Sequence, residues 1–177
     1  WWENPYPNFM PDTDWVRREI KSSGGRKHHD QIFGDFDGDG TDELVFWNQG
    51  MLKLYLAEIP SDPHTSGPWV LQEVFSWTGS QYEGLAKADM DGDGILDIVG
   101  GGGWFKYDGN GSYSLEVIDA QQTFTRVATG QLKAGGRPEV VFVVGDGNGR
   151  LKWYEWNGAN WVGQDLLGFD VDHGHSL

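Results

Sequence analysis

An acidic loop of nine residues, present twice in nearly the same form, constrains this chain more than any other feature. The first copy runs from Asp35 to Glu43 and the second from Asp89 to Asp97. In both copies carboxylates stand at loop positions 1, 3, 5 and 9, and glycines at positions 4 and 6 permit a sharp turn. Carboxylates crowded in this way repel one another unless a cation lies among them. The spacing therefore predicts two metal sites.

The predicted ligands are all oxygen atoms, a set that suits Ca²⁺, which takes roughly six to eight oxygens in flexible geometry. An EF-hand begins similarly but needs a glutamate at position 12, where this chain has Phe46 and Gly100. Two solvated Asp-Gly turns are the alternative, which the full repetition of the spacing disfavours. With a backbone carbonyl at position 7, the expected ligands are Asp35, Asp37, Asp39, Thr41 and Glu43, then Asp89, Asp91, Asp93, Ile95 and Asp97.

Composition narrows the class of protein. A 14% aromatic content with 10 Trp and 27 Gly is typical of short strands and tight turns. The net charge of −14 argues against nucleic acid or an anionic bilayer as a partner. No apolar run is long enough for membrane insertion, and the absence of Cys means that disulfides do not hold the fold. Weak Ca²⁺ loops suit millimolar calcium, which predicts an extracellular, secreted protein, although no signal peptide opens the chain.

The chain divides into repeats when it is aligned on the acidic loops, and each repeat contains four short strands, as a propeller blade does. Blades are expected over residues 29–82, 83–123 and 124–174, with 1–28 ending a preceding blade and 175–177 starting a next one. The sequence thus predicts an all-β fold of about three and a half β-propeller blades, a single segment that belongs to a larger propeller or is completed by further chains. The expected strands are 31–34, 43–47, 52–57, 69–75, 85–88, 97–101, 104–107, 113–118, 126–130, 139–144, 151–156 and 161–167.

The third repeat lacks the carboxylates of the other two. Its loop, from Gly130 to Glu139, is basic, and the alignment makes it one residue longer. We therefore expect no third Ca²⁺ here, and we expect a Lys or Arg side chain to take the place of the missing cation.

The two loops with their flanks, Gly34 to Val45 and Ala88 to Val99, resemble the FG-GAP or VCBS repeats of bacterial secreted proteins and of the integrin α-subunit head. The resemblance implies a β-propeller in which Ca²⁺ loops join the first and second strands of each blade and stabilise the strands. It implies metal ligands at Asp35, Asp37, Asp39 and Glu43, and at Asp89, Asp91, Asp93 and Asp97.

The linkers between blades should gather at the rim opposite the acidic loops, and they contain four of the five histidines. One interpretation is an enzyme, because some polysaccharide lyases resemble this propeller class, with the rim supplying base, acid and a clamp for a sugar carboxylate. The alternative is that the histidines only hydrogen-bond to neighbouring backbone. The catalytic candidates are His29, Tyr82, Arg126, His173 and His175.

Binding is the favoured interpretation, with a glycan or an extracellular or cell-surface protein as the partner. Aromatic platforms would serve such a role, although core packing explains the same residues. The candidates are Trp77, Tyr82, Trp47 and Trp104, of which Trp77 is expected to be the most exposed. A third possibility is a structural subunit of an extracellular fibre, which would self-assemble through the incomplete blades.

Overall fold

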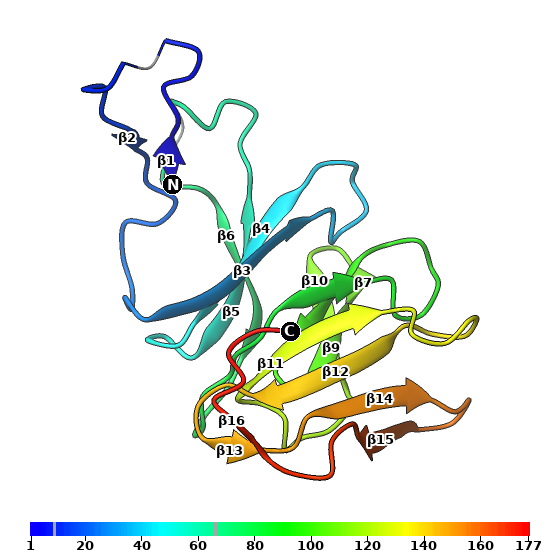
Figure 1. The fold of residues 1–177 in the computed structure, drawn as a ribbon. Helices are drawn as coiled ribbons and strands as arrows, with labels where there is room; N and C mark the ends of the chain where they lie inside the picture. Colours follow the sequence, from blue (N-terminus) through cyan, green and yellow to red (C-terminus); the bar gives the residue numbers. More distant parts are fainter. Residues whose placement is uncertain (9, 66) are drawn as a thin grey trace.

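The structure, a computed structural model, describes residues 1–8, 10–65 and 67–177. Across these ranges the chain forms strands and turns and contains no helix that could cross a membrane. Three four-stranded antiparallel sheets follow one another along the chain (Figure 1). The all-β prediction is confirmed, and the three sheets are consistent with propeller blades.

Each four-stranded sheet is a simple meander, and we call the sheets blades 1, 2 and 3. Blade 1 contains β3 (His28–Gly34), β4 (Glu43–Asn48), β5 (Lys53–Glu58) and β6 (Leu71–Ser76). Blade 2 contains β7 (Ala86–Ala88), β8 (Asp97–Gly100), β9 (Gly103–Gly109) and β10 (Ser112–Val117). Blade 3 contains β11 (Thr125–Gly130), β12 (Glu139–Val144), β14 (Lys152–Trp156) and β15 (Trp161–Asp165). Every strand expected for these blades is present, with ends shifted by a few residues.

Two short ribbons accompany the blades. At the N-terminus β1 (Trp2–Glu3) pairs with β2 (Val16–Arg17) in an antiparallel ribbon. Near the C-terminus β13 (Asn148–Gly149) pairs with β16 (Val171–Asp172), a contact that the sequence did not predict. The backbone N–H of Gly174 also donates to the carbonyl of Val144 at 3.0 Å, so the predicted last linker folds back against blade 3.

The first strand of blade 1 begins earlier than expected because a bulge allows it to continue. The pairing of β3 with β4 shifts register between His29 and Gln31, and Asp30 has a φ of 42°. A β-bulge inserts one extra residue and turns its side chain away from the regular alternation. The pattern before Gln31 therefore did not look like a strand.

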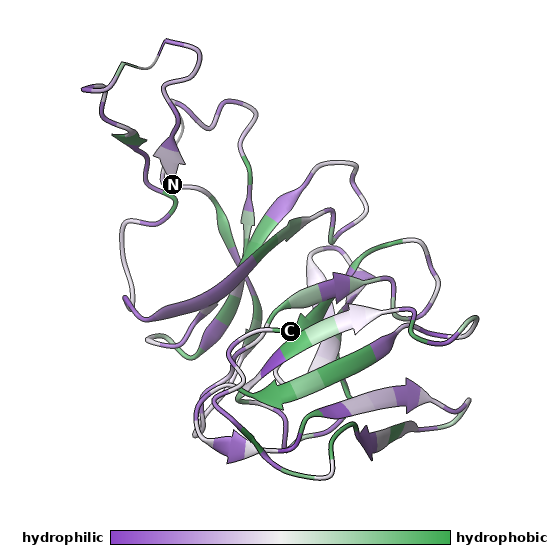
Figure 2. Ribbon diagram, in the orientation of Figure 1, coloured by the Kyte–Doolittle hydropathy of each residue, from purple (hydrophilic) through white to green (hydrophobic). Residues whose placement is uncertain are grey.

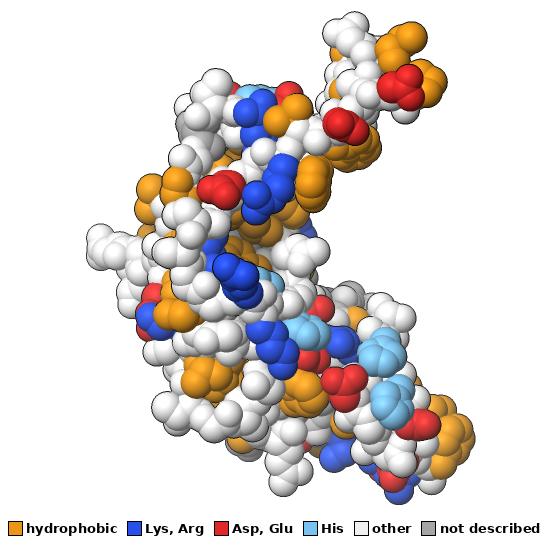
Figure 3. Space-filling model, turned by 90° about the vertical axis from the view of Figure 1, so that its left-hand side faces the viewer, with side chains coloured by type: hydrophobic (Ala, Val, Ile, Leu, Met, Phe, Trp, Pro, Cys, Tyr) orange, Lys and Arg blue, Asp and Glu red, His pale blue; other side chains and the backbone are white. Residues whose placement is uncertain are grey.

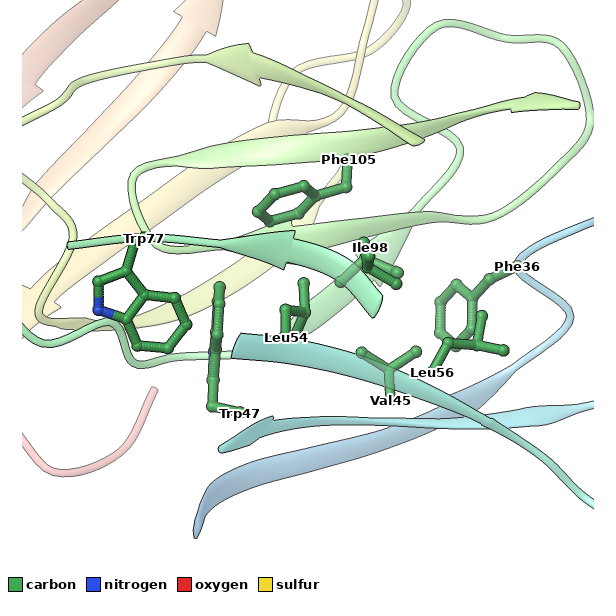
Figure 4. Close-up of a cluster of buried hydrophobic side chains, with 9 residues drawn as sticks. Phe36, Val45, Trp47, Leu54, Leu56, Trp77, Ile98 and Phe105 are labelled. Carbon is green, nitrogen blue, oxygen red and sulfur yellow. The ribbon is translucent and has the colours of Figure 1, made fainter. Parts of the chain in front are cut away.

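Large side chains fill the spaces between neighbouring blades. In β4 every residue from Glu43 to Asn48 is buried, because both faces of this inner strand are covered. The core between blades 1 and 2 includes Trp47, Leu54 and Phe105 (Figure 4). Hydrophobic colouring in Figure 2 extends along part of β4 and along much of β12. Blade-to-blade packing thus supplies most of the apolar burial.

The core between blades 2 and 3 is built in the same way, from Val99, Trp104, Phe142 and Tyr154 among others. At loop position 2 both acidic loops also carry an apolar residue with no solvent exposure, Phe36 in the first core and Met90 in the second. Each loop is therefore anchored by one side chain between its own blade and the next.

Three of the four aromatic residues expected to bind a ligand belong to these cores. Trp47 is 0% exposed, Trp77 is 8% exposed and Trp104 is 3% exposed. The expectation that Trp77 is the most exposed was wrong, because its ring packs against Trp47 and Tyr82 with centroids 5.5 and 4.9 Å away. Tyr82 is partly buried beside Trp47 and Trp77. Core packing therefore accounts for the three tryptophans better than an open stacking surface does.

Candidate metal centres

The first acidic loop connects β3 to β4 and wraps around its own first carboxylate. Asp35 accepts backbone N–H groups from Gly38 at 2.8 Å and from Gly40 at 3.1 Å. Gly40 has a φ of 92°, a conformation that glycine adopts without steric cost. The turn brings four carboxylates together, with ligand atoms within 4.8 Å of one another: Asp35, Asp37, Asp39 and Glu43.

Glu43 is the buried member of this cluster, with no solvent exposure. Its Oε2 accepts the backbone N–H of Phe36 at 2.8 Å, whereas its buried Oε1 has no hydrogen-bond partner among the described residues. Burial raises the pKa of Glu43 to about 7, and the negative charges of Asp37 and Glu58 add to the shift. A buried carboxylate oxygen without a partner is costly, and a cation bound among these groups would remove that cost. The first loop therefore fits a metal ion.

The second acidic loop connects β7 to β8 and repeats this geometry. Asp89 accepts the backbone N–H of Gly94 at 3.0 Å, and Asp97, which is 2% exposed, accepts that of Met90 at 2.7 Å. Burial raises the pKa of Asp97 to about 7. The carboxylates whose ligand atoms lie within 4.8 Å of one another are Asp89, Asp91 and Asp97.

Asp93 lies outside this second cluster because a lysine draws its carboxylate away. The Nζ of Lys106 is 2.7 Å from Oδ2 of Asp93 and also contacts Asp91. These hydrogen bonds raise the pKa of Lys106, and the bond from Lys106 lowers the pKa of Asp93. An ammonium group thus neutralises part of the second loop.

A glutamate takes the corresponding position in blade 1. Glu58 in β5 lies opposite Glu43 in β4. In blade 2, Ile98 pairs with Phe105, so the same register places Lys106 opposite Asp97. Burial and the charges of Asp37 and Asp39 raise the pKa of Glu58. The two acidic loops therefore have the same backbone but opposite charges beside them, negative at the first and positive at the second.

The sequence around both loops matches a known repeat family. Residues 35–100 match the FG-GAP-like repeat. The FG-GAP-like segment begins at the first residue of the first acidic loop and ends with β8, so it contains both candidate metal centres. The resemblance seen in the sequence is confirmed over this range. No curated protein shows a significant match to the chain.

The third loop has the same frame as the two FG-GAP loops but a different interior. Because β11 ends at Gly130, Gln131 takes loop position 1 and Glu139 takes position 9, so the loop is not one residue longer. The amide Nε2 of Gln131 donates to the carbonyl of Gly135 at 2.9 Å and to that of Lys133. Glu139 accepts the backbone N–H of Leu132 at 2.7 Å, as Glu43 and Asp97 do in their loops.

The expectation that a Lys or Arg fills the third loop was wrong. The ammonium of Lys133 pairs with Glu155 outside the loop, and the guanidinium of Arg137 lies over the ring of Trp156, 4.6 Å from its centroid. A neutral amide suffices because the loop has lost its inner carboxylates and needs only hydrogen-bond donors at its centre.

Two of the catalytic candidates meet at a partly buried cluster on the opposite rim, which we call the polar hub: His29, Asp30, Gln49, Glu83 and Arg126. Glu83 is 1% exposed, and Nη1 of Arg126 lies 2.8 Å from its Oε2. The Nδ1 of His29 lies 3.3 Å from Oε1 of Glu83, and Gln49 donates to the same oxygen at 3.0 Å. Asp30 lies 3.3 Å from Arg126 and accepts the backbone N–H of Gly84. The hub joins all three blades.

The remaining rim candidates are arranged differently. Tyr82 packs into the aromatic core, 5.7 Å from Trp47 by ring centroids. The rings of His173 and His175 lie 5.9 Å apart on the exposed C-terminal segment. Histidine, basic and acidic side chains do gather on the face of the molecule seen in Figure 3. Of the catalytic candidates, the structure therefore brings His29 and Arg126 together through Glu83.

Three residues that shape these loops were missed in the sequence. Gln131 could have been found, because the expected strand 126–130 already ended at Gly130, but the alignment counted Gly130 as loop position 1. Glu58 and Lys106 could not, because they come from the third strand of each blade, and the connections that set their register differ in length.

Proposed function

We propose that this chain is a Ca²⁺-stabilised FG-GAP-type segment of an extracellular β-propeller that acts as a carbohydrate- or protein-binding module in adhesion. In this proposal Asp35, Asp37, Asp39 and Glu43 hold one ion, and Asp89, Asp91 and Asp97 hold a second. The bound ion would supply the positive charge that each loop lacks and tie the first strand of a blade to the second. Binding free energy at such a site adds directly to the free energy of unfolding.

The observation that carries the metal assignment is the unpartnered Oε1 of Glu43, buried among three further carboxylates. Hard oxygen ligands without nitrogen or sulfur favour Ca²⁺ or Mg²⁺ over transition metals. The irregular loop, with ligands from both backbone and side chains, suits the flexible geometry of Ca²⁺ better than the strict octahedron of Mg²⁺. Weak calcium loops suit the millimolar calcium found outside cells, which supports the extracellular assignment.

Binding is favoured over catalysis by the state of the rim. Arg126 and His29 both contact Glu83, a carboxylate with 1% exposure. To clamp a substrate carboxylate, Arg126 would have to leave a buried negative charge without its partner, which is strongly unfavourable. This arrangement supports a role for the hub in holding blades together, and it gives less support to a lyase.

Thermal unfolding with and without calcium tests the proposal. Calcium at 100 times its Kd should add about 3 kcal/mol per site to the free energy of unfolding, and excess chelator should remove it. Glu43→Gln should abolish the part of the shift due to the first loop. Glu139→Gln is the matched control, because it alters the same loop position in the blade expected to bind no ion. A melting curve that does not respond to chelator would overturn the proposal.

A further inference from the structure

A cavity of about 280 Å³ lies between blades 2 and 3, next to the second acidic loop. Its volume is close to the lower end of ligand pockets, which span roughly 300–1,000 Å³, so it suits one small group. Its wall consists of Val117, three indoles and four charged side chains; the indoles are Trp104, Trp156 and Trp161, and the charged groups are Asp91, Lys106, Glu116 and Arg137. The cavity is separate from the histidine-bearing rim.

Arg137 is the central polar group of this wall. Its guanidinium lies 4.6 Å from the ring centroid of Trp156 and 5.8 Å from that of Trp104. Stacking fixes the plane of the guanidinium and leaves its N–H edge available. Within the part of the chain that the structure describes, Arg137 makes no side-chain hydrogen bond or ion pair. An oriented cation without an acceptor is therefore present in the cavity.

A second donor in the wall also lacks a partner. Trp104 is 3% exposed, and its Nε1 has no hydrogen-bond acceptor among residues 1–8, 10–65 and 67–177. A buried indole N–H usually finds an acceptor. Both unpartnered groups are donors, whereas the nearby Lys106 is already paired with Asp91 and Asp93. A negatively charged hydrogen-bond acceptor bound in the cavity would therefore satisfy these donors.

The indoles indicate what carries that acceptor. Trp156 and Trp161 meet edge to face with centroids 5.7 Å apart, and both remain partly exposed. A pyranose ring presents a face of C–H groups that can pack against an indole while its substituents reach the polar wall. An acidic peptide side chain could use Arg137 but would have no ring to place against Trp161. The combination favours a sugar with a carboxylate.

We infer that this cavity binds a hexuronic acid unit of a glycan, with its carboxylate on Arg137 and its ring against Trp161. This inference deepens the binding role in the proposed function and rests on it. The net charge of −14 disfavours a long polyanion, so the ligand is an isolated acidic unit in an otherwise neutral glycan.

Isothermal titration in millimolar calcium tests the inference with methyl glucuronide, and with methyl glucoside as the neutral analogue. The wild-type protein should bind the glucuronide and bind the glucoside at least about tenfold more weakly, because a charge-assisted contact is lost. Arg137→Met should weaken glucuronide binding about tenfold or more. Trp161→Ala should weaken it about fivefold. Arg17→Met is the control, since Arg17 is exposed on the N-terminal ribbon and should leave binding unchanged.

Three outcomes would overturn the inference: no glucuronide binding by the wild type, equal binding of both sugars, or equal binding by Arg137→Met and wild type. N-acetylaspartate that binds as tightly as the glucuronide and is insensitive to Trp161→Ala would overturn the sugar assignment. The calcium shift in the melting curve of each variant reports correct folding. It also separates the two proposals. Glucuronide binding can fail while calcium still stabilises the protein, and glucuronide can bind while calcium has no stabilising effect.

Discussion

Lys106 and Glu58 occupy the same register position in neighbouring blades, and their opposite charges make the two candidate metal centres unequal. Glu58 lies beside a cluster of four carboxylates and adds a fifth negative charge. Lys106 contacts two carboxylates of its own loop. A cation entering the second loop must displace this ammonium, whereas at the first loop no such competitor is present among the described residues. We therefore expect the first loop to bind Ca²⁺ more tightly.

Replacing Lys106 with Met should raise the calcium affinity of the second loop about tenfold, because the competing charge is removed while the aliphatic part of the side chain is kept. Calorimetric titration of wild type and variant measures both sites. Lys53→Met is the matched control, since Lys53 has the same 31% side-chain exposure and pairs with Glu73 away from the loops. Unchanged affinities in Lys106→Met would contradict the role given to this lysine.

The metal-free protein should become less stable as pH rises from about 4 to about 7. The pKa of Glu43 and that of Asp97 are both raised to about 7 by burial, so the folded state binds more protons than the unfolded state in this range. The stabilisation from the protonated forms is complete near pH 4 and is lost as pH passes the folded pKa. The loss is on the order of a few kcal/mol. Calcium binds the ionised forms, so the calcium-induced rise in Tm should grow over the same interval.

Unfolding of metal-free protein across this pH range checks the sign. Glu43→Gln and Asp97→Asn should each flatten the pH dependence, because neither amide titrates. Stability that rises between about pH 5 and about pH 7 in the metal-free protein would contradict the assignment of raised pKa values to these two carboxyls.

The loop between the first and second strands is the element that all three blades share. In each loop, position 2 is an apolar residue, and its backbone N–H donates to the carboxylate at position 9. The pairs are Phe36 with Glu43, Met90 with Asp97, and Leu132 with Glu139. The residue at position 1 differs, because Asp35 and Asp89 accept backbone N–H groups, whereas Gln131 donates to backbone carbonyls. The three loops therefore share the hydrogen bond between positions 2 and 9, and they differ in the side chain at position 1 that hydrogen-bonds to the backbone.

Removing the side chain at position 1 should have different consequences in different blades. Gln131→Ala should lower the free energy of unfolding by about 1 kcal/mol, the usual net value of a hydrogen bond, and by the same amount with and without calcium. Asp35→Ala should cost stability mainly when calcium is present. Melting of both variants in calcium and in chelator gives the comparison, and a calcium-dependent loss in Gln131→Ala would contradict the amide-filled loop.

The elements that could be predicted from the sequence are those set by local patterns. Strands such as Glu43–Asn48 and Glu139–Val144 are continuous runs of β-forming residues, and the acidic loops carry their ligands within nine positions. What could not be predicted depends on contacts between distant residues. Trp77 looks exposed in its polar surroundings, yet Trp47, thirty residues earlier in the chain, packs edge to face against its ring. Likewise, the pairing of β13 with β16 depends on a return of the chain that no local pattern marks.

At the scale of the whole molecule, the polar hub is the feature that connects the blades on the side away from the metal centres. His29 and Asp30 belong to blade 1, Glu83 precedes blade 2 and Arg126 belongs to blade 3. Because Arg126 contacts both acidic members, its one charge satisfies groups from two other blades. The blades are thus held by apolar cores between them and by one ionic cluster at their rim.

Arg126→Met should destabilise the protein by about 3–5 kcal/mol, because Glu83 then remains buried without its cation. Chemical denaturation measures the loss. Glu83→Gln combined with Arg126→Met should recover part of it, since the double variant has no buried unpaired charge, and the difference gives the coupling energy of the pair. Arg17→Met, at an exposed arginine, should change stability by less than about 0.5 kcal/mol. A loss in Arg126→Met as small as in this control would contradict the role of the hub.

The third loop also bears on how such repeats change during evolution. Its frame survives with Gln131 in place of the first carboxylate, and Lys106 in blade 2 already neutralises part of a loop that keeps its acidic ligands. Side by side, the three blades form a graded series: a loop with four clustered carboxylates, a loop partly neutralised by a neighbouring lysine, and a loop filled by an amide. The second and third loops have only the glycine at position 6 in common, yet the carboxylate at position 9 accepts the same backbone N–H in both. A lineage could therefore lose its requirement for calcium one repeat at a time without passing through an unfolded ancestor.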